Sequence, residues 1–259
     1  MRAIILLSFL LIYNPICYGS LHDIIDADLF RTKKLDNIDQ RLKMLALSEI
    51  SNLREVETVI PFSGNLVIKD AYVLSEYPDI YIFSIEDNHV YGGSSQRDPY
   101  EVFIFNSSDS TIYPFGSGYV RFSKVFNTDL KKIYNNGVND IIQLVKLYLY
   151  SLHQSSNYYL LFTLDDYINL WRNSQERHIK TYLEQYGEEA NAEIEKELKQ
   201  LRQYFTRFSI TQEQGYYQIE ISTWNNISGN VEFWRFRISS KVFEVYEHDT
   251  LLVKVGPRR

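Results

Sequence analysis

Apolar and polar side chains alternate along the C-terminal part of the chain, from Tyr216 to Val255. A period of two residues is typical of β-strands, because successive side chains of a strand point to opposite faces of its sheet. Short polar links such as His248-Asp249 interrupt the alternation. The pattern predicts an antiparallel meander of four strands, at Tyr216–Trp224, Val231–Ile238, Lys241–Glu247 and Thr250–Val255.

The same alternation assigns every side chain of the meander to one of two faces. The predicted core face carries Ile219, Ile221, Trp234, Phe236, Ile238, Phe243, Val245, Leu251, Val253 and Val255. The predicted open face carries Glu220, Ser222, Trp224, Arg235, Arg237, Glu244, Tyr246 and Lys254. Acidic and basic side chains alternate from strand to strand on the open face, which favours cross-strand ion pairs.

Two further hairpins are predicted in the first half of the chain, where β-branched and aromatic residues are frequent. The first covers residues 66–85 and turns at Glu76–Asp79, and the second covers residues 100–115 and turns at Asn106–Asp109. Between them, residues 86–99 are polar and contain glycine, which predicts a long surface loop.

Apolar residues recur every three or four positions in the remaining segments, which predicts amphipathic helices. One helix or helix pair is expected within Leu21–Val56, and two helices after residue 118, separated at Asn135-Asn136-Gly137. The second of these two, Asp140–His153, is apolar nearly all round and is expected to be buried. Thr163–Phe208 is again helical in pattern, with a break expected at Gly187.

These elements place the chain in the α+β class, with helices packed on small antiparallel sheets. A C-terminal helix followed by a four-stranded antiparallel meander resembles the cystatin-like or NTF2-like element order, in which a sheet wraps a helix. The resemblance concerns element order alone and implies no function. Residues 1–19 are interpreted as a signal peptide, 20–155 as an N-terminal α+β lobe and 156–259 as a C-terminal lobe, with one continuous domain as the alternative.

The N-terminus has the pattern of a cleavable secretory signal. Arg2 precedes the apolar run Ala3–Tyr13, which is too short to cross a hydrocarbon layer of roughly 30 Å as a helix. Small residues at Cys17 and Gly19 predict cleavage after Gly19, and a secreted or periplasmic protein. A lipoprotein acylated at Cys17 is the alternative, disfavoured because Asn14-Pro15-Ile16 lacks a small residue next to the cysteine.

Composition restricts the chemistry further. Cys17 is the only cysteine, so the mature chain is expected to lack disulfides, thiol nucleophiles and cysteine-bound metals. Without Arg2, 26 basic side chains remain against 33 acidic ones, a formal net charge of −7. This balance argues against nucleic acid as a partner and against a polybasic membrane anchor. No transmembrane segment is expected once the signal is removed.

No motif of nucleophilic, metal or cofactor chemistry stands out. Gly116-Ser117-Gly118 follows a hairpin and is not the G-x-S-x-G elbow of hydrolases, so a turn is the favoured interpretation. His22 and Asp26 have helical ligand spacing but lie at the expected mature N-terminus, and Glu247-His248-Asp249 is explained by a polar turn. We therefore expect neither a metal nor a cofactor.

Asp165-Asp166 is the most prominent pair of neighbouring carboxylates. Thr163-Leu164-Asp165-Asp166 resembles a capping box, so capping of a helix start is favoured over catalysis. The alternative function is a secreted hydrolase of polysaccharide or peptide, with an unrecognised site near Asp165, Asp166, His153 or His89.

The favoured function is a non-enzymatic exported protein that binds a partner protein or a cell-surface component. The chain contains 21 Tyr, 15 Phe and 3 Trp, and peptides and sugars stack on exposed aromatic rings. Trp224, Arg235 and Tyr246 are the expected exposed binding residues of the open face, with Tyr91 in the long loop. A purely structural envelope component is not separated from this hypothesis by the sequence.

Overall fold

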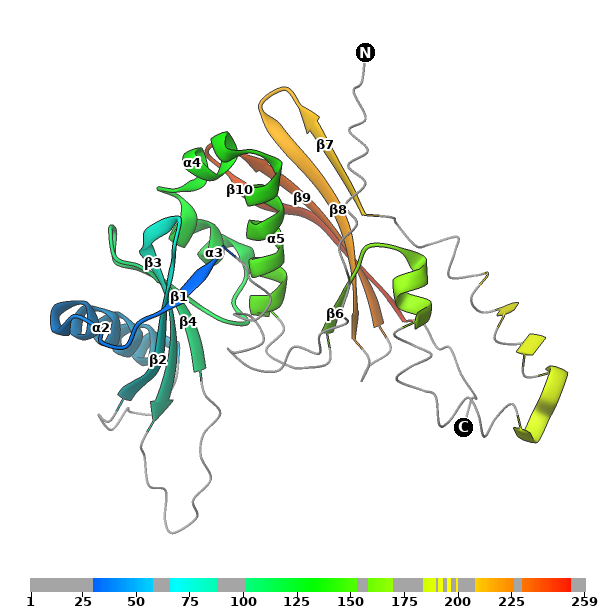
Figure 1. The fold of residues 1–259 in the computed structure, drawn as a ribbon, viewed down its shortest axis with the longest axis horizontal. Helices are drawn as coiled ribbons and strands as arrows, with labels where there is room; N and C mark the ends of the chain where they lie inside the picture. Colours follow the sequence, from blue (N-terminus) through cyan, green and yellow to red (C-terminus); the bar gives the residue numbers. More distant parts are fainter. Residues whose placement is uncertain are drawn as a thin grey trace, which may run out of the picture. The chain divides into compact units, whose positions relative to one another are not determined.

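The computed structural model of the chain forms two compact units (Figure 1). It describes residues 30–57, 66–87, 101–152, 158–169, 208–225 and 230–252, and helical residues at 184–189, 191, 192, 195, 196 and 199. The N-terminal unit contains the described residues up to Leu152 and residues 240–243, and the C-terminal unit contains the others. The predicted signal peptide lies outside the described residues. The predicted division into an N-terminal lobe at 20–155 and a C-terminal lobe at 156–259 stays a prediction.

An antiparallel sheet of the order β1-β2-β3-β4-β5 organises the N-terminal unit. Its strands are β1 (Thr32–Lys34), β2 (Leu66–Leu74), β3 (Tyr77–Asp87), β4 (Glu101–Asn106) and β5 (Thr111–Pro114). The β2–β3 and β4–β5 pairs are the two hairpins predicted from the sequence. The second hairpin has its turn between Asn106 and Thr111, where it was expected.

The first hairpin turns earlier than predicted, at Ser75-Glu76 instead of Glu76–Asp79. Leu74 pairs with Tyr77, so Tyr77 already belongs to β3. Its side chain is buried. A register shift next to this pair leaves Pro78 outside the β2 ladder. A proline is compatible with that position, because a residue outside the ladder does not need a backbone N–H to donate.

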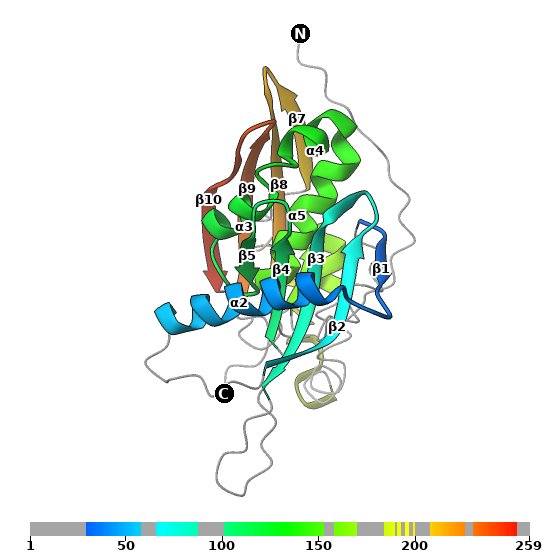
Figure 2. The ribbon, with the colours of Figure 1, turned by 90° about the vertical axis from the view of Figure 1, so that its left-hand side faces the viewer.

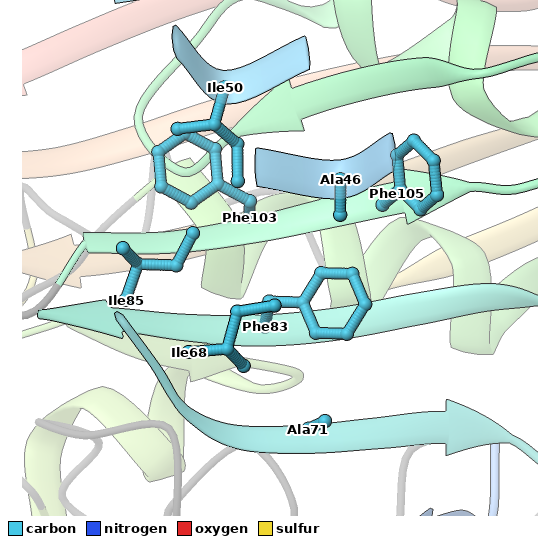
Figure 3. Packing of buried hydrophobic residues seen from close by; sticks show 8 residues of the cluster. All are labelled: Ala46, Ile50, Ile68, Ala71, Phe83, Ile85, Phe103 and Phe105. Carbon is cyan, nitrogen blue, oxygen red and sulfur yellow. The ribbon is translucent and has the colours of Figure 1, made fainter. Parts of the chain in front are cut away.

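Helix α2 (Gln40–Glu57) covers one face of this sheet (Figure 2). Asp39 precedes the helix, and its carboxylate accepts hydrogen bonds from the backbone N–H groups of Arg41 and Leu42, as an N-cap does. Alternate strand positions meet the apolar stripe of the helix in one buried cluster (Figure 3). The cluster contains Ala46, Ile50, Ile68, Ala71, Phe83, Ile85, Phe103 and Phe105.

The intervening strand positions point to the opposite face, where three helices pack. These are α3 (Tyr119–Phe126), α4 (Leu130–Asn136) and α5 (Val138–Leu152). The Tyr113 ring of β5 meets the Phe122 ring of α3 edge-on, with the ring centroids 5.2 Å apart. Helix α5 is largely buried, as its apolar sequence predicted. The sheet therefore lies between α2 on one face and α3–α5 on the other (Figure 1).

Two helical predictions in this unit need correction. Thr32–Lys34 was expected to be helical within Leu21–Val56, but it is the edge strand β1 and pairs with the end of β2. Three helices, and not two, follow residue 118, because residues 127–129 separate α3 from α4. The predicted break at Gly137 is present, with a φ of +102° that favours glycine.

Strand β8 (Tyr216–Asn225) lies inside the sheet of the C-terminal unit. One edge of β8 pairs along its length with β9 (Asn230–Ser239), which in turn neighbours β10 (Phe243–Leu252). The other edge is shared: β7 (Ser209–Glu213) pairs with its first half, and β6 (Tyr158–Leu161) with its second half. The α+β class and the C-terminal antiparallel meander are thus confirmed.

The strand boundaries of the meander differ from the prediction. Lys241–Glu247 and Thr250–Val255 were expected as two strands around a turn at His248-Asp249, but β10 runs through that dipeptide without a turn. The polar character of this segment suggested a turn. In the strand, however, polar side chains on both faces have partners on β9: Glu247 contacts Arg235, and His248 contacts Glu232. The fourth strand of the meander is instead β7, which precedes β8.

The segment Thr163–Phe208, predicted to be helical, is described in part. A helix covers residues 164–169, and helical residues recur between 184 and 199. Gly187, the expected break, has a φ of +55°. Whether a sheet wraps a long helix, as the cystatin-like element order implies, depends on residues outside the described part. Of the helices in the described ranges, none has the length and apolar character needed to span a membrane.

Candidate functional site

The predicted open face of the C-terminal sheet carries a ladder of charged and aromatic side chains. Glu220 on β8 is directly opposite Arg235 on β9, and Arg235 Nε lies 3.0 Å from Glu220 Oε1. The Arg235 guanidinium also donates to Glu247 on β10. This second hydrogen bond raises the pKa of Arg235, against the opposing effect of burial. Three strands are therefore joined through one side chain.

Arg237 forms the second step of the ladder. Its guanidinium carbon lies 5.1 Å from the ring centroid of Tyr216 and 5.0 Å from that of Tyr246. Its Nη1 is 3.8 Å from Glu244 Oε2, a looser contact than that between Arg235 and Glu220. We call Tyr216, Glu220, Arg235, Arg237, Glu244, Tyr246 and Glu247 the ladder face.

The pKa values of both tyrosines of the ladder face are raised above the ordinary value of a phenol. The hydrogen bond from the Tyr216 hydroxyl to Glu213 raises the pKa of Tyr216 above its ordinary value. Partial burial raises the pKa of Tyr246. Since a neutral phenol both donates and accepts hydrogen bonds, each ring offers a polar edge next to an aromatic face.

The ladder face is accessible. The side chains of Arg235 and Arg237 are 39% and 46% exposed, and those of Glu244 and Glu247 are 39% and 42% exposed. Two arginines stand against three glutamates within it, so the face is mixed in charge with a slight acidic excess. Two of the sequence-predicted binding residues, Arg235 and Tyr246, belong to it, and their binding role stays a prediction.

Trp224 differs from its companions on the predicted open face. It was expected to be exposed, but its side chain is 2% exposed. Its ring packs edge-on against Tyr167, which belongs to the short helix after β6, at a centroid distance of 5.5 Å. The expectation of exposure was wrong because helix residues distant in sequence cover this end of the sheet. Tyr91, the fourth predicted binding residue, lies outside the described residues.

Thr163 and Asp166 cap the start of the helix at residues 164–169, as the capping-box pattern predicted. The Asp166 carboxylate accepts the backbone N–H groups of Phe162 and Thr163, and the Thr163 hydroxyl accepts the backbone N–H of Asp166. Asp165 is exposed on the helix surface. His153 and His89, the other two residues of the hydrolase hypothesis, lie outside the described residues.

The opposite face of the same sheet contains a polar cluster that the sequence analysis missed. His248 stacks on Trp234 with the ring centroids 3.6 Å apart, and its Nε2 lies 3.4 Å from Glu232 Oε2. The Trp234 indole N–H donates to the Thr223 hydroxyl at 3.0 Å. The Glu232 side chain is 11% exposed, whereas that of His248 is 39% exposed.

A signal for this cluster was present in the sequence. Glu232 precedes Trp234 by two residues, so the alternation that assigned Trp234 to the core face assigns Glu232 to it as well. A carboxylate at a core-face position needs a partner, because an unpaired buried charge is costly. The partner of Glu232 was not predicted, because His248 was interpreted as a turn residue.

The arrangement of these side chains limits the chemistry available to them. Among the residues that the structure describes, no three His, Cys, Asp or Glu side chains gather as a metal site requires. Glu232 and His248 form a carboxylate–imidazole contact, in which His248 Nε2 lies 3.4 Å from Glu232 Oε2. Ser117 lies in a turn: its backbone N–H donates to Pro114 and its carbonyl accepts from the Tyr113 hydroxyl.

No family model matches the chain, and comparisons with curated proteins and with solved structures also give no match.

Proposed function

We propose that this chain is an exported, non-enzymatic binding protein that recognises a partner protein through the ladder face. The observation that carries the proposal is the Arg237 guanidinium held between the rings of Tyr216 and Tyr246. Arginine and tyrosine contribute most to binding at protein interfaces, since each combines a large contact area with hydrogen bonding. Here both types are half-exposed and positioned before any partner arrives.

Prior ordering of these side chains favours binding. Arg235 is held by Glu220 and Glu247, and Arg237 by two rings, so little rotamer freedom is left for a partner to remove. Immobilising a long side chain at an interface otherwise costs about 0.5–1.5 kcal/mol. A protein surface with its own mixed charges complements this face. A polyphosphate would have to displace the glutamates from both arginines, which argues against nucleic acid.

Site-specific photo-crosslinking tests the ladder face directly. A benzophenone amino acid is placed at Tyr246, and at Tyr186 as an exposed control in a helical segment. We expect a defined crosslinked partner from position 246 only, and its loss in Arg237→Ala but not in Lys124→Ala, which removes a positive charge from the exposed surface of α3. Equal crosslinking from both positions, or an unchanged yield in Arg237→Ala, contradicts the proposal.

Export has its own test, which is the intact mass of protein recovered from fractionated cells and medium. We expect a chain that begins at Ser20 and is found outside the cytoplasm. A diacylglycerol-sized increment on a chain that begins at Cys17 makes the protein a tethered lipoprotein. An unprocessed chain in the cytoplasm contradicts export.

The Glu232–His248 pair favours a hydrolase as the second candidate function. A largely buried carboxylate next to a half-exposed imidazole is an arrangement found in general-base catalysis, which contributes about 10²–10⁴-fold to a rate. Fluorogenic peptides and dyed polysaccharides are the substrates to assay. Loss of turnover in both Glu232→Gln and His248→Gln, but not in Glu244→Gln, would establish it. Absence of turnover by the wild-type protein removes this candidate for these substrates.

A further inference from the structure

Strand β10 is the terminal strand of its sheet. The strand order is β10-β9-β8-β6, so β9 pairs with one edge of β10, and no described strand pairs with the other (Figure 2). The strand is ten residues long, from Phe243 to Leu252. By contrast, the opposite edge of β8 is occupied by β6 and β7. Toward that edge, β10 thus presents a row of backbone donors and acceptors that no described strand pairs with.

Proteins usually protect such an edge. Short strands, prolines and edge lysines are the common devices, because each prevents a second chain from adding to the ladder. Strand β10 has none of these: it is long, and its sequence Phe-Glu-Val-Tyr-Glu-His-Asp-Thr-Leu-Leu contains no proline, lysine or arginine. The only charge-based protection of this strand is acidic, from Glu244, Glu247 and Asp249.

The acidic residues indicate what the edge accepts and what it rejects. Glu244 and Glu247 contact arginines of β9 yet stay 39% and 42% exposed, and Asp249 is exposed. Pairing with a second copy of β10 would bring acidic strands together, and like charges on neighbouring strands are destabilising. An extended segment rich in lysine or arginine would instead gain main-chain hydrogen bonds and complementary charge.

We propose that β10 accepts an extended basic peptide segment of a partner protein as an added strand of the C-terminal sheet. The proposal rests on the function proposed above and identifies the chemical character of the partner. The added strand would lie next to the ladder face, so its side chains on that side would reach Tyr246 and Glu244. Main-chain pairing would supply affinity and the acidic residues specificity, as in other strand-addition complexes.

A synthetic peptide tests strand addition with the full mature chain. The probe is a fluorescently labelled peptide of about eight residues that alternates lysine and valine, a length that matches a typical strand. The matched control has the same composition with proline at its centre, which cannot donate to a ladder. We expect the alternating peptide to bind by fluorescence anisotropy, at least about tenfold more tightly than the proline peptide. Equal binding of the two overturns strand addition and leaves only charge attraction.

Charge reversal on the protein locates the site. Asp249→Lys should weaken binding of the alternating peptide by about tenfold or more, because it replaces attraction with repulsion. Asp109→Lys, in a turn of the other unit, should leave it unchanged. Circular dichroism and thermal unfolding of both variants establish that each is folded. An unchanged affinity in folded Asp249→Lys overturns the proposal, as does a concentration-dependent dimer whose formation excludes the peptide.

The test separates this inference from the proposed function. If the partner still crosslinks at Tyr246 while the alternating peptide fails to bind, the ladder face is right and strand addition is wrong. If the peptide binds but no partner crosslinks at Tyr246, strand addition is right and the ladder face is wrong.

Discussion

Glu220 and Arg235 face each other across β8 and β9, and Arg235 Nε lies 3.0 Å from Glu220 Oε1. The same guanidinium reaches Glu247 on the next strand. Because the Arg235 side chain is 39% exposed, solvent screens both ion pairs, and they contribute little to stability. Their main effect is to hold the arginine in one conformation.

This arrangement predicts a small coupling energy. In a double-mutant cycle, Glu220→Gln and Arg235→Met should couple by about 0.2–1 kcal/mol in free energy of unfolding, and less at high salt. Urea denaturation of the four proteins in low and high salt measures the coupling. A coupling of several kcal/mol that is independent of salt would show that the pair is more buried and more important for folding than its exposure indicates.

Asn106 should be far more sensitive, because it is fully buried at the end of β4. Its Nδ2 donates to the carbonyl of Val125 at 2.7 Å and to the Thr128 hydroxyl at 3.1 Å, while its Oδ1 accepts from Ser108. Asn106→Leu leaves these groups without a partner, and we expect it to lower the free energy of unfolding by about 2–4 kcal/mol. Ser107→Ala, its neighbour in the turn, should change it by less than about 0.5 kcal/mol in the same denaturation experiment. Equal effects of the two substitutions would contradict this account.

The raised pKa of Tyr113 leads us to expect a loss of folding stability at alkaline pH. Burial raises its pKa to about 12 from 10.0, although the hydrogen bond with Ser151 opposes the shift. The neutral phenol is favoured in the folded state, so its contribution is complete below pH 10 and is lost as the pH rises through about 12. A shift of this size corresponds to about 2–3 kcal/mol.

Tyr113→Phe removes the ionisation and should therefore flatten part of the decline in stability between pH 10 and about 12. Burial also raises the pKa values of Tyr77 and Tyr148, so a remaining decline is expected. Urea denaturation at a series of pH values measures the effect, with Tyr186→Phe, an exposed tyrosine, as the control. A pH profile of Tyr113→Phe identical to that of the wild type would show that Tyr113 does not control the loss.

Asp166 separates capping from catalysis. Its carboxylate accepts two backbone N–H groups at the start of the helix, so Asp166→Ala should lower stability by about 1 kcal/mol. Asp165→Ala, at an exposed position of the same helix, should have little effect on thermal unfolding. Neither substitution should affect crosslinking at Tyr246. Loss of a hydrolytic activity in Asp166→Ala with unchanged stability would instead make Asp166 a catalytic residue.

Elements with strong local signals were predicted well from the sequence. Strands β8 and β9 follow from alternation, and the register of β8 on β9 places Glu220 opposite Arg235, as the alternating charges suggested. The buried helix α5, the left-handed break at Gly137 and the capping box at Thr163 also follow from local rules, because each depends on residues only a few positions apart.

Predictions failed where the decisive contacts connect distant residues. Thr32–Lys34 carries no strand signal of its own and becomes β1 because it pairs with β2, far along the chain. His248-Asp249 is polar enough for a turn, but Glu232 and Trp234 on β9 hold His248 in a continuous strand. Local strand propensity contributes less free energy than such cross-strand contacts, so the tertiary structure determines the secondary structure of these two segments.

The sequence by itself determined the α+β class of this protein and the two faces of strands β8 and β9, because periodicity and turn residues act locally. Only the tertiary structure decided which side chains of the open face are accessible. Trp224 has the same alternation signal as Arg235, but the ring of Tyr167 covers it, and no local pattern reports what packs over a sheet. The Glu232–His248 pair likewise required the fold, because two strands must align before their side chains can meet.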